Sequence, residues 1–201
     1  MILNFIIESI KHDGGNKMKR ALTIQEMALV GMCAALMGIF SQLAIPIPFS
    51  SVPLTLQTFG VVVIAVILEY KLGSLSMLIW TLIGTIGLPV FAGFSGGMGV
   101  LLGPTGGYII GFIFMTFIIG LAASKKNKVL LFAAAYIGQA VQYAFGVMQM
   151  KYVLGLSWNE ALVAGVYPFA IKDIIVVTAA VIVSLIIKNA LKGVVTNHVK
   201  A

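Results

Sequence analysis

The sequence predicts an all-α integral membrane protein, a bundle of six transmembrane helices with both termini in the cytoplasm. Three observations predict it: an apolar composition, six apolar segments, and an uneven distribution of Lys and Arg. Of the 201 residues, 60% are hydrophobic and 9% are charged, and the mean hydropathy is +1.08. A soluble domain carries roughly 25% charged residues. So little polar surface cannot cover a water-exposed globule, which leaves an integral membrane protein as the fitting class.

A helix that crosses the bilayer needs about 20 mostly apolar residues. Six segments are candidates: residues 22–43, 54–69, 73–90, 108–123, 129–149 and 169–188. The second and third are short, and a tight turn at Lys71–Leu72–Gly73 separates them. No internal repeat or long linker is evident, so we expect a single membrane domain over residues 18–201. Residues 1–17 are expected to form a disordered or interfacial extension.

The distribution of Lys and Arg predicts the orientation, because cytoplasmic loops carry the excess of these residues. Eleven of the thirteen fall on the side of the termini: Lys11, Lys17, Lys19, Arg20, Lys71, Lys125, Lys126, Lys128, Lys188, Lys192 and Lys200. The opposite side has Lys151 alone, and Lys172 lies within the sixth helix. Both termini are therefore predicted to be cytoplasmic.

The three segments predicted to face outward, 44–53, 91–107 and 150–168, are also the most irregular parts of the chain. Prolines cannot continue a helix, and the first segment contains three of them, Pro46, Pro48 and Pro53. Long loops gathered on one face commonly carry function. The alternative is that these segments are plain connections between helices.

The stretch FAGFSGGMGVLLGPTGGY, residues 91–108, contains seven glycines and no charged residue. It is not a nucleotide-binding loop, because Pro104 stands where the phosphate-binding lysine is required. Glycine allows close backbone approach, and apolar side chains alternate with the glycines. We therefore expect an apolar lid over the outer mouth of the bundle, with Thr105 available to hydrogen-bond a ligand.

Asp173 is the most informative single residue. If Pro168 precedes a helix that begins near Phe169, Asp173 lies one turn inside the last span. An ionisable group in a span is costly and usually faces a cavity or a partner. Asp173 is therefore a candidate acceptor for ligand N–H groups. The alternative is a structural role in which Lys151 or Lys172 neutralises it.

Other polar and small residues allow two interpretations each. Gln139, Gln142 and Tyr143 lie on neighbouring turns of the fifth helix, where they either face a cavity or join helices. Gly31 and Ala35 are four residues apart on the first helix, a spacing that allows another helix to pack closely, within the chain or in a partner.

The sequence from Ser157 to Glu160 matches a capping box, which predicts a short helix on the outer face and a structural role for Glu160.

Catalytic and metal-binding sets are missing from the sequence. The two histidines, His12 and His198, lie in the tails, and Cys33 is within a span. No Ser/His/Asp or Cys/His set and no metal-ligand cluster can be assembled. An enzyme is therefore not expected, nor is a metal or other cofactor. With Asp173 as the one acid that could serve as a buried polar relay, uphill transport would need energy from partner subunits.

Three motifs carry a resemblance to a known family: VPLTLQTFG (52–60), GLPVFAGFSGGMGVLLGPTGGYIIGF (87–112) and GVYPFAIKD (165–173). Over about residues 22–190 the chain resembles the BioY family, the biotin-specific substrate-binding (S) components of energy-coupling-factor transporters. The resemblance implies a subunit of the prokaryotic cell membrane that holds one biotin with high affinity near the outer face. It also implies ATP-driven uptake with a membrane coupling protein (T component) and two cytoplasmic ATPases as partners.

The same resemblance implies roles for particular residues. Asp173 matches the family aspartate that accepts hydrogen bonds from the ureido N–H groups of biotin. The first-helix surface that docks onto the coupling protein corresponds to Gly31 and Ala35. The family's outer-loop positions correspond to Thr55, Gln57, Gly93, Phe94 and Tyr108.

Two departures concern the biotin carboxylate. Many family members have Lys three residues after the aspartate, where this chain has Val176, and many have an Arg where this chain has Ile109 and Ile110. Either Lys172 or Lys151 replaces the missing cation, or the carboxylate stays in water at the cavity mouth. The departure also leaves open an uptake component for another small vitamin or cofactor precursor. A stand-alone membrane enzyme is a weaker alternative.

Overall fold

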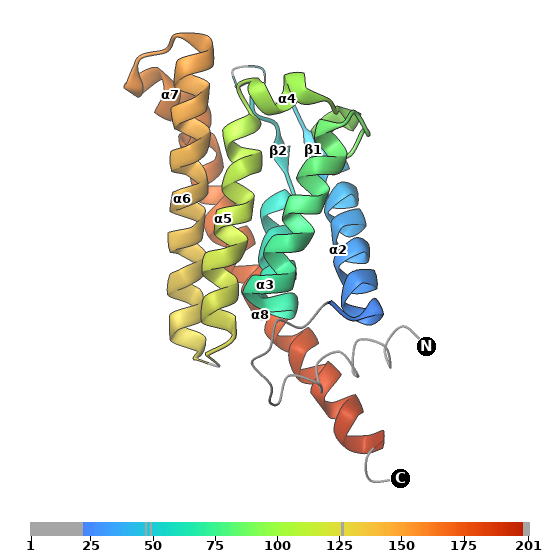
Figure 1. The fold of residues 1–201 in the computed structure, drawn as a ribbon. Helices are drawn as coiled ribbons and strands as arrows, with labels where there is room; N and C mark the ends of the chain where they lie inside the picture. Colours follow the sequence, from blue (N-terminus) through green and yellow to red (C-terminus); the bar gives the residue numbers. More distant parts are fainter. Residues whose placement is uncertain (1–21, 47, 49, 126, 199–201) are drawn as a thin grey trace.

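The chain folds as a helical bundle with irregular segments gathered at one end (Figure 1). The computed structural model describes residues 22–46, 48, 50–125 and 127–198, and side chains up to residue 190. The expected extension at residues 1–17 lies outside this part. Five described helices are long and apolar enough to cross a membrane: α2 (Ile24–Gln42), α3 (Gln57–Thr85), α5 (Gly106–Ala123), α6 (Lys128–Leu154) and α8 (Tyr167–His198).

The shorter elements lie at the upper end of the bundle in Figure 1. They are β1 (Ala44–Ile45), β2 (Leu54–Thr55), the 3₁₀ turn η1 (Ala92–Phe94), α4 (Met98–Leu102) and α7 (Trp158–Gly165). β1 and β2 form a two-residue antiparallel ribbon that pairs Ala44 with Thr55, a small exception to the all-α prediction. The ribbon forms because the prolines between the strands prevent a helix and leave extended backbone on either side.

α3 contains both the second and the third predicted span, and it doubles back at Glu69. The backbone of Glu69 is not helical (φ 59°, ψ −169°), and a Cβ placed on Gly73 would lie 3.6 Å from the Cα of Ala65. Lys188 of α8 stabilises the turn, since its Nζ donates to the Val66 carbonyl (3.2 Å) and pairs with Glu69 Oε1 (3.0 Å). The turn comes earlier than the predicted Lys71–Leu72–Gly73.

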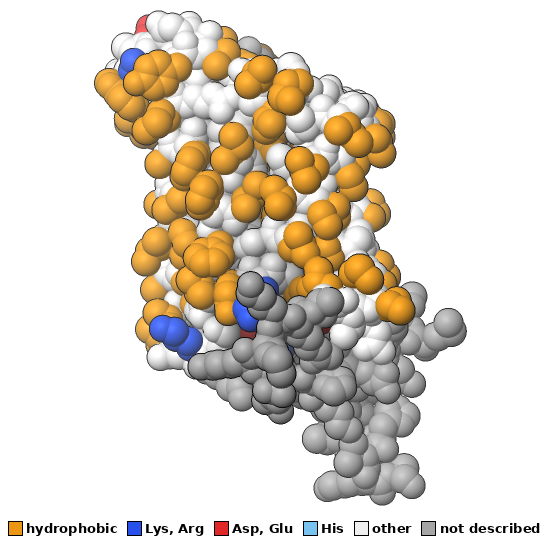
Figure 2. Space-filling model, viewed as in Figure 1, with side chains coloured by type: hydrophobic (Ala, Val, Ile, Leu, Met, Phe, Trp, Pro, Cys, Tyr) orange, Lys and Arg blue, Asp and Glu red, His pale blue; other side chains and the backbone are white. Residues whose placement is uncertain are grey.

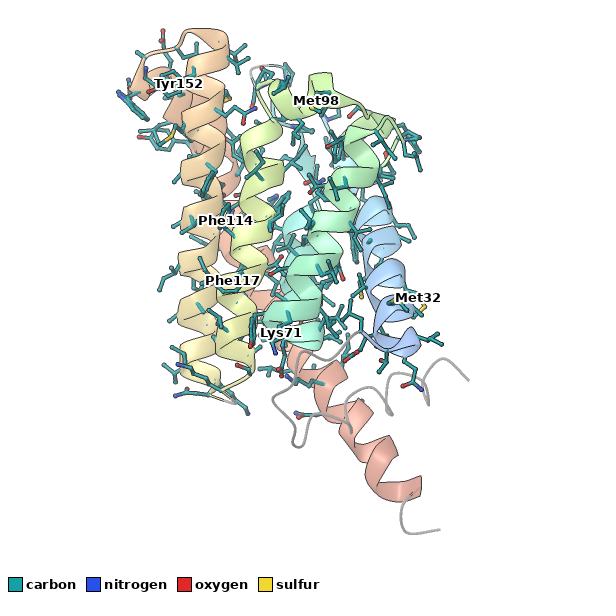
Figure 3. The ribbon with its side chains drawn as sticks, in the orientation of Figure 1. Met32, Lys71, Met98, Phe114, Phe117 and Tyr152 are labelled. Atoms are coloured by element: carbon teal, nitrogen blue, oxygen red, sulfur yellow. The ribbon has the colours of Figure 1, made fainter. Side chains whose placement is uncertain are left out.

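The three segments predicted to share one side do lie together. Ser50 Oγ donates to the Ala164 carbonyl at 2.7 Å, which joins the first segment to the third. In Figure 3, Met98 and Tyr152 lie at this end of the bundle and Lys71 at the opposite end. Lys188 lies with Lys71 near the α3 turn. The predicted separation of basic residues from the irregular segments is therefore confirmed for these two lysines.

Helix boundaries follow local chemistry. Thr23 and Glu26 form a capping box at the start of α2, and Ser157 and Glu160 form the predicted one at α7. The backbone N–H and hydroxyl of Ser157 hold the pKa of the Glu160 carboxyl below its ordinary value. α8 begins at Tyr167, two residues before the predicted start near Phe169. Pro168 is tolerated in the first turn, because an N–H there has no partner within the helix.

Close packing of α5 on α6 depends on glycine. A Cβ on Gly111 would lie 2.8 Å from the Cα of Gln142, and one on Gly146 would collide with the Tyr108 ring. The core continues through Trp80 and Phe91, whose rings meet edge to face at 5.1 Å. Outside the core, hydrophobic side chains cover most of the height of the visible face (Figure 2), as expected of a surface in contact with lipid.

We predict that Gly111→Ala destabilises the bundle by about 1–3 kcal/mol, because the methyl group forces α5 and α6 apart. The matched control is Gly31→Ala on α2, where a Cβ meets nothing within 4 Å. Thermal unfolding in detergent should show a lower midpoint for Gly111→Ala and no decrease for Gly31→Ala. Equal midpoints would contradict this account of the α5–α6 contact.

Candidate functional site

A cavity of about 320 Å³ opens among the irregular segments. A concave, mostly apolar site of this size with a few polar groups is typical of small-molecule binding. The β1–β2 connection, the start of α3, the glycine-rich segment, α5, α6 and α8 all contribute to its wall. The lining residues are Ser51, Val52, Pro53, Thr55, Gln57, Thr58, Phe91, Ala92, Ser95, Gly99, Val100, Gly103, Pro104, Thr105, Tyr108, Ile109, Phe112, Gln142, Tyr143, Phe169, Lys172 and Asp173.

Asp173 of α8 is buried in this wall, with 5% of its surface exposed. Its Oδ2 accepts hydrogen bonds from the Tyr143 hydroxyl (2.6 Å) and from Gln139 Nε2 (3.4 Å). Its Oδ1 lies 2.8 Å from Lys172 Nζ. This ion pair lacks hydrogen-bond geometry, so Oδ1 has no hydrogen-bond donor among the described residues. Oδ1 is therefore a buried carboxylate oxygen that is paired with the Lys172 ammonium group and has unused hydrogen-bond acceptor capacity.

Two glutamines of α6 extend this network. Gln139 Nε2 donates to Gln142 Oε1 (3.0 Å) as well as to Asp173. An ionised carboxylate only accepts hydrogen bonds, which fixes the amide nitrogen of Gln139 toward Asp173. Gln142 then uses its oxygen within the network, and its amide nitrogen has no hydrogen-bond partner in the described part of the chain. The wall thus places an unused Gln142 N–H donor in the same network as the Asp173 carboxylate, which is ion-paired with Lys172.

Both interpretations of these α6 residues apply. Gln142 and Tyr143 line the cavity, whereas Gln139 lies behind the wall and joins α6 to α8 through Asp173.

Lys172 lies on the cavity wall next to Asp173. Its Nζ donates to the Thr55 carbonyl of β2 (3.1 Å) and lies 5.9 Å from the centre of the Phe169 ring. Lys151 is elsewhere, over the rings of Tyr152 and Trp158. Of the two lysines considered as partners of Asp173, the structure pairs Lys172 with it. Lys172 therefore neutralises the Asp173 carboxylate in part, while Asp173 Oδ1 still has no hydrogen-bond donor among the described residues.

Four more of the predicted residues, Thr55, Gln57, Thr105 and Tyr108, also line the cavity. Gln57 accepts from the Thr55 hydroxyl (3.0 Å) and donates to Ser41 Oγ (2.9 Å), which ties the start of α3 to α2. The Tyr108 hydroxyl donates to the Gly165 carbonyl at 3.0 Å. Tyr108 therefore joins α5 to the end of α7, and it presents part of its ring to the cavity.

Gly93 and Phe94 do not line the cavity, contrary to their expected place in the binding site. Phe91 is buried against Trp80 and Gly84, and Ala92 and Ser95 on either side of Gly93–Phe94 still line the cavity. Gly93 has φ 67°, and Phe94 is 73% exposed. The Phe94 N–H donates to Gln42 Oε1 at 2.8 Å, which fixes this turn to the end of α2.

Sequence reasoning left open whether Gln142 faces a cavity, and it did not select several other wall residues, among them Phe91, Phe112 and Phe169. The aromatic residues gave no signal, because a phenylalanine in a span is equally consistent with core, cavity wall or lipid contact. Within the described residues, no group of three or more His, Cys, Asp or Glu is placed to hold a metal ion.

The two small residues of α2 lie away from the cavity. Gly31 and Ala35 are exposed on the described structure, and a Cβ on Gly31 would have open space around it. They belong to the same helix as Met32, whose side chain points outward in Figure 3. Close packing of α2 within the chain therefore does not account for Gly31 and Ala35.

Comparisons with known proteins agree on one family. The BioY family model matches residues 16–193. The chain is 42% identical to the "Probable biotin transporter BioY" of Pyrococcus horikoshii over 160 residues, 80% of this chain and 94% of that protein. It is 40% identical to the "Biotin transporter BioY" of Thermotoga maritima over 158 residues, 76% of this chain and 93% of that protein.

A solved structure agrees with these sequence matches. The fold is similar to a crystal structure of the S-component for biotin from an ECF-type ABC transporter. The TM-score is 0.76 and the identity 25%, and the match covers 84% of this chain and 95% of the other. The family model matches most of this chain, the match extends over nearly the full length of the relatives, and the fold is shared. This chain therefore belongs to the BioY family.

Proposed function

We propose that this chain is the membrane subunit that captures biotin with high affinity at the outer face, for ATP-driven uptake by an energy-coupling-factor complex. Membership of the BioY family, relatives named as biotin transporters and a fold shared with a biotin S-component support this function. The observation that carries it is a pair of neighbouring polar groups on the cavity wall: Asp173 Oδ1, which has no hydrogen-bond donor within the described residues, and the amide nitrogen of Gln142, which has no acceptor there.

This pairing complements the head of biotin. A cyclic urea presents N–H donors beside a carbonyl acceptor, so Asp173 can accept from an N–H while Gln142 donates to the carbonyl. A charge-assisted hydrogen bond is stronger than a neutral one, which favours a ligand that donates to Asp173. Phe112 and Phe169 supply apolar wall for the sulfur ring and the carbon chain.

We further propose that α3 contributes two membrane segments, which gives six in total and places both termini in the cytoplasm. Its halves, residues 57–68 and 70–85, are about 18 and 24 Å long at 1.5 Å per residue. Both are short for a bilayer core of about 30 Å, so the Glu69 turn lies near the inner interface. The lysines at that end support a cytoplasmic position, and the cavity then faces outward.

The nearest described cation for the biotin carboxylate is Lys172, since it lies on the cavity wall and Lys151 does not. Lys172 is already shared between Asp173 and the Thr55 carbonyl. The Lys172 side chain is 27% exposed, and an ion pair in contact with water contributes little, about 0–1 kcal/mol. We therefore propose that Lys172 makes a modest contribution to binding the biotin carboxylate. Recognition of the urea is assigned to Asp173 and Gln142.

The proposed partners are a membrane coupling protein and two cytoplasmic ATPases, and the proposed contact surface includes Gly31 and Ala35. Small residues allow two helix backbones to approach within the bilayer. The exposure of both residues supports a partner outside the chain.

A second candidate function, uptake of another small vitamin, is favoured by Val176 in place of the family lysine.

Detergent-purified protein should retain labelled biotin at about one molecule per chain, and excess unlabelled biotin should displace it better than other vitamins. Asp173→Asn should weaken binding by about 1.5–3 kcal/mol, the scale of a hydrogen bond to a charged group. Glu69→Gln at the opposite end is the matched acid-to-amide control and should leave affinity unchanged. Preferential displacement by a different vitamin would favour the second candidate, and full affinity in Asp173→Asn would remove this residue from the site.

Lys172→Met should lower the affinity for biotin by up to about fivefold, corresponding to the contribution of about 0–1 kcal/mol from an ion pair. Its effect on biotinamide, which lacks the carboxylate charge, should be smaller. Both ligands are titrated against wild type, Lys172→Met and Lys151→Met. The comparison distinguishes a carboxylate bound by Lys172, one bound by Lys151 and one that stays in water. Equal losses for the two ligands would mean that the carboxylate stays in water, and a loss in Lys151→Met alone would reassign the cation.

Ala35→Leu should prevent assembly with the coupling protein and ATPases while leaving biotin retention unchanged, because a large side chain keeps the helices apart. Ala144→Leu is the matched control, since Ala144 is an exposed alanine on α6. Co-purification of the co-expressed subunits measures assembly. Normal assembly of Ala35→Leu would place the contact surface elsewhere.

A further inference from the structure

α4 is a short helix held between two glycines over the cavity. Gly97 precedes it with φ 98°, a conformation that favours glycine, and Gly103 follows it. On one side Gly99 and Val100 line the cavity. On the other side Met98 and Leu102 are exposed, and Met98 lies at the upper end of the bundle in Figure 3. α4 is thus a small lid with a glycine at each end.

One side chain fastens this lid to the bundle. Gln149 of α6 donates from Nε2 to the Leu101 carbonyl (2.7 Å) and to the Gly103 carbonyl (2.8 Å), near the C-terminal end of α4. A Cβ on Gly106 would lie 2.6 Å from this Nε2 and would collide with the Leu101 carbonyl oxygen. The absence of a side chain at Gly106 therefore makes room for the contact.

The neighbouring part of the glycine-rich segment is held in more ways. Trp80 Nε1 donates to the Val90 carbonyl (3.1 Å), Gly97 N–H donates to the Gly84 carbonyl (2.7 Å), and Phe91 is buried. Gln42 adds hydrogen bonds to the carbonyls of Pro89 and Phe91. For residues 98–103, by contrast, the side-chain hydrogen bonds from another membrane helix within the described structure come from Gln149. One backbone contact is added at the end of the segment, where the N–H of Gly106, the first residue of α5, donates to the Gly103 carbonyl (3.2 Å). The lid thus depends on one side chain, whereas its neighbour has several anchors.

We propose that Gln149 is the latch that holds α4 closed and so sets how fast ligand enters and leaves the cavity. This inference rests on the proposed function and goes beyond it, since Gln149 does not line the cavity and acts through α4. The two hydrogen bonds hold the lid in the empty protein as well as in the loaded one. Loss of the latch therefore raises the association and dissociation rates together and leaves the equilibrium affinity nearly unchanged.

The test compares Gln149→Met with wild type in the purified full-length chain. Met is similar in length and flexible, but it cannot donate to the two carbonyls. Association and chase-dissociation of labelled biotin should each become roughly 5- to 100-fold faster, given the usual contribution of two hydrogen bonds. Gln42→Met, which loses hydrogen bonds to the better-anchored part, is the matched control and should change both rates by less than about twofold.

A measurement without ligand separates failure of the latch from failure of biotin binding. Hydrogen exchange of the peptide covering residues 98–103 should accelerate in Gln149→Met, while the thermal midpoint stays at the wild-type value. If wild type does not retain biotin, the proposed function fails and hydrogen exchange still decides on the latch. Unchanged exchange in this peptide, unchanged ligand rates, or a faster dissociation without faster association would each overturn the inference.

Discussion

A carboxylate buried in an apolar bundle is the constraint on which the site depends. Asp173 is 5% exposed, and an isolated charge in such a place is strongly unfavourable. Tyr143, Gln139 and Lys172 therefore surround it with one hydroxyl, one amide and one ammonium group. This set draws α6 and β2 toward α8, because Lys172 also holds the Thr55 carbonyl. One carboxylate oxygen stays without a hydrogen-bond donor among the described residues, so the group that organises the wall is also the acceptor proposed for the ligand.

Close backbone approach is the second requirement, and glycine meets it at defined places. Gly111 brings α5 against the Gln142 backbone, which places Gln142 at the cavity. At the opposite end, a Cβ on Gly120 would collide with the backbone nitrogen of Tyr70, so the α3 turn can lie directly against α5. In a bilayer, lipid chains are as apolar as the side chains, so tight packing rather than water exclusion joins the helices. The glycines thus connect helix packing to the geometry of the site.

The two ends and one side of the bundle have separate roles in the proposed mechanism. The irregular end holds the cavity and its α4 lid, the opposite end holds the Glu69–Lys188 ion pair at the α3 turn, and α2 carries exposed small residues along its length. Gln42, the last residue of α2, contacts the segment that includes Phe91 and Phe94. The helix proposed to meet the partner is therefore in direct contact with the segment that lines the cavity.

The sequence by itself determined the membrane class, the grouping of three irregular segments at one end, and the position of Asp173 inside the last span, because composition, proline positions and a charge within a span have direct physical consequences. It also determined the α7 capping box, which is a local interaction between residues three apart. Only the tertiary structure decided that α3 turns at Glu69, since Lys188, 119 residues away, stabilises that turn. It alone showed that Gly93 and Phe94 do not line the cavity, and that the Phe94 N–H instead bonds Gln42 of α2. Likewise the packing of α5 on α6 decided between the two interpretations of Gln142 and made Gln149 a lid contact, because a single sequence does not show which distant residues meet.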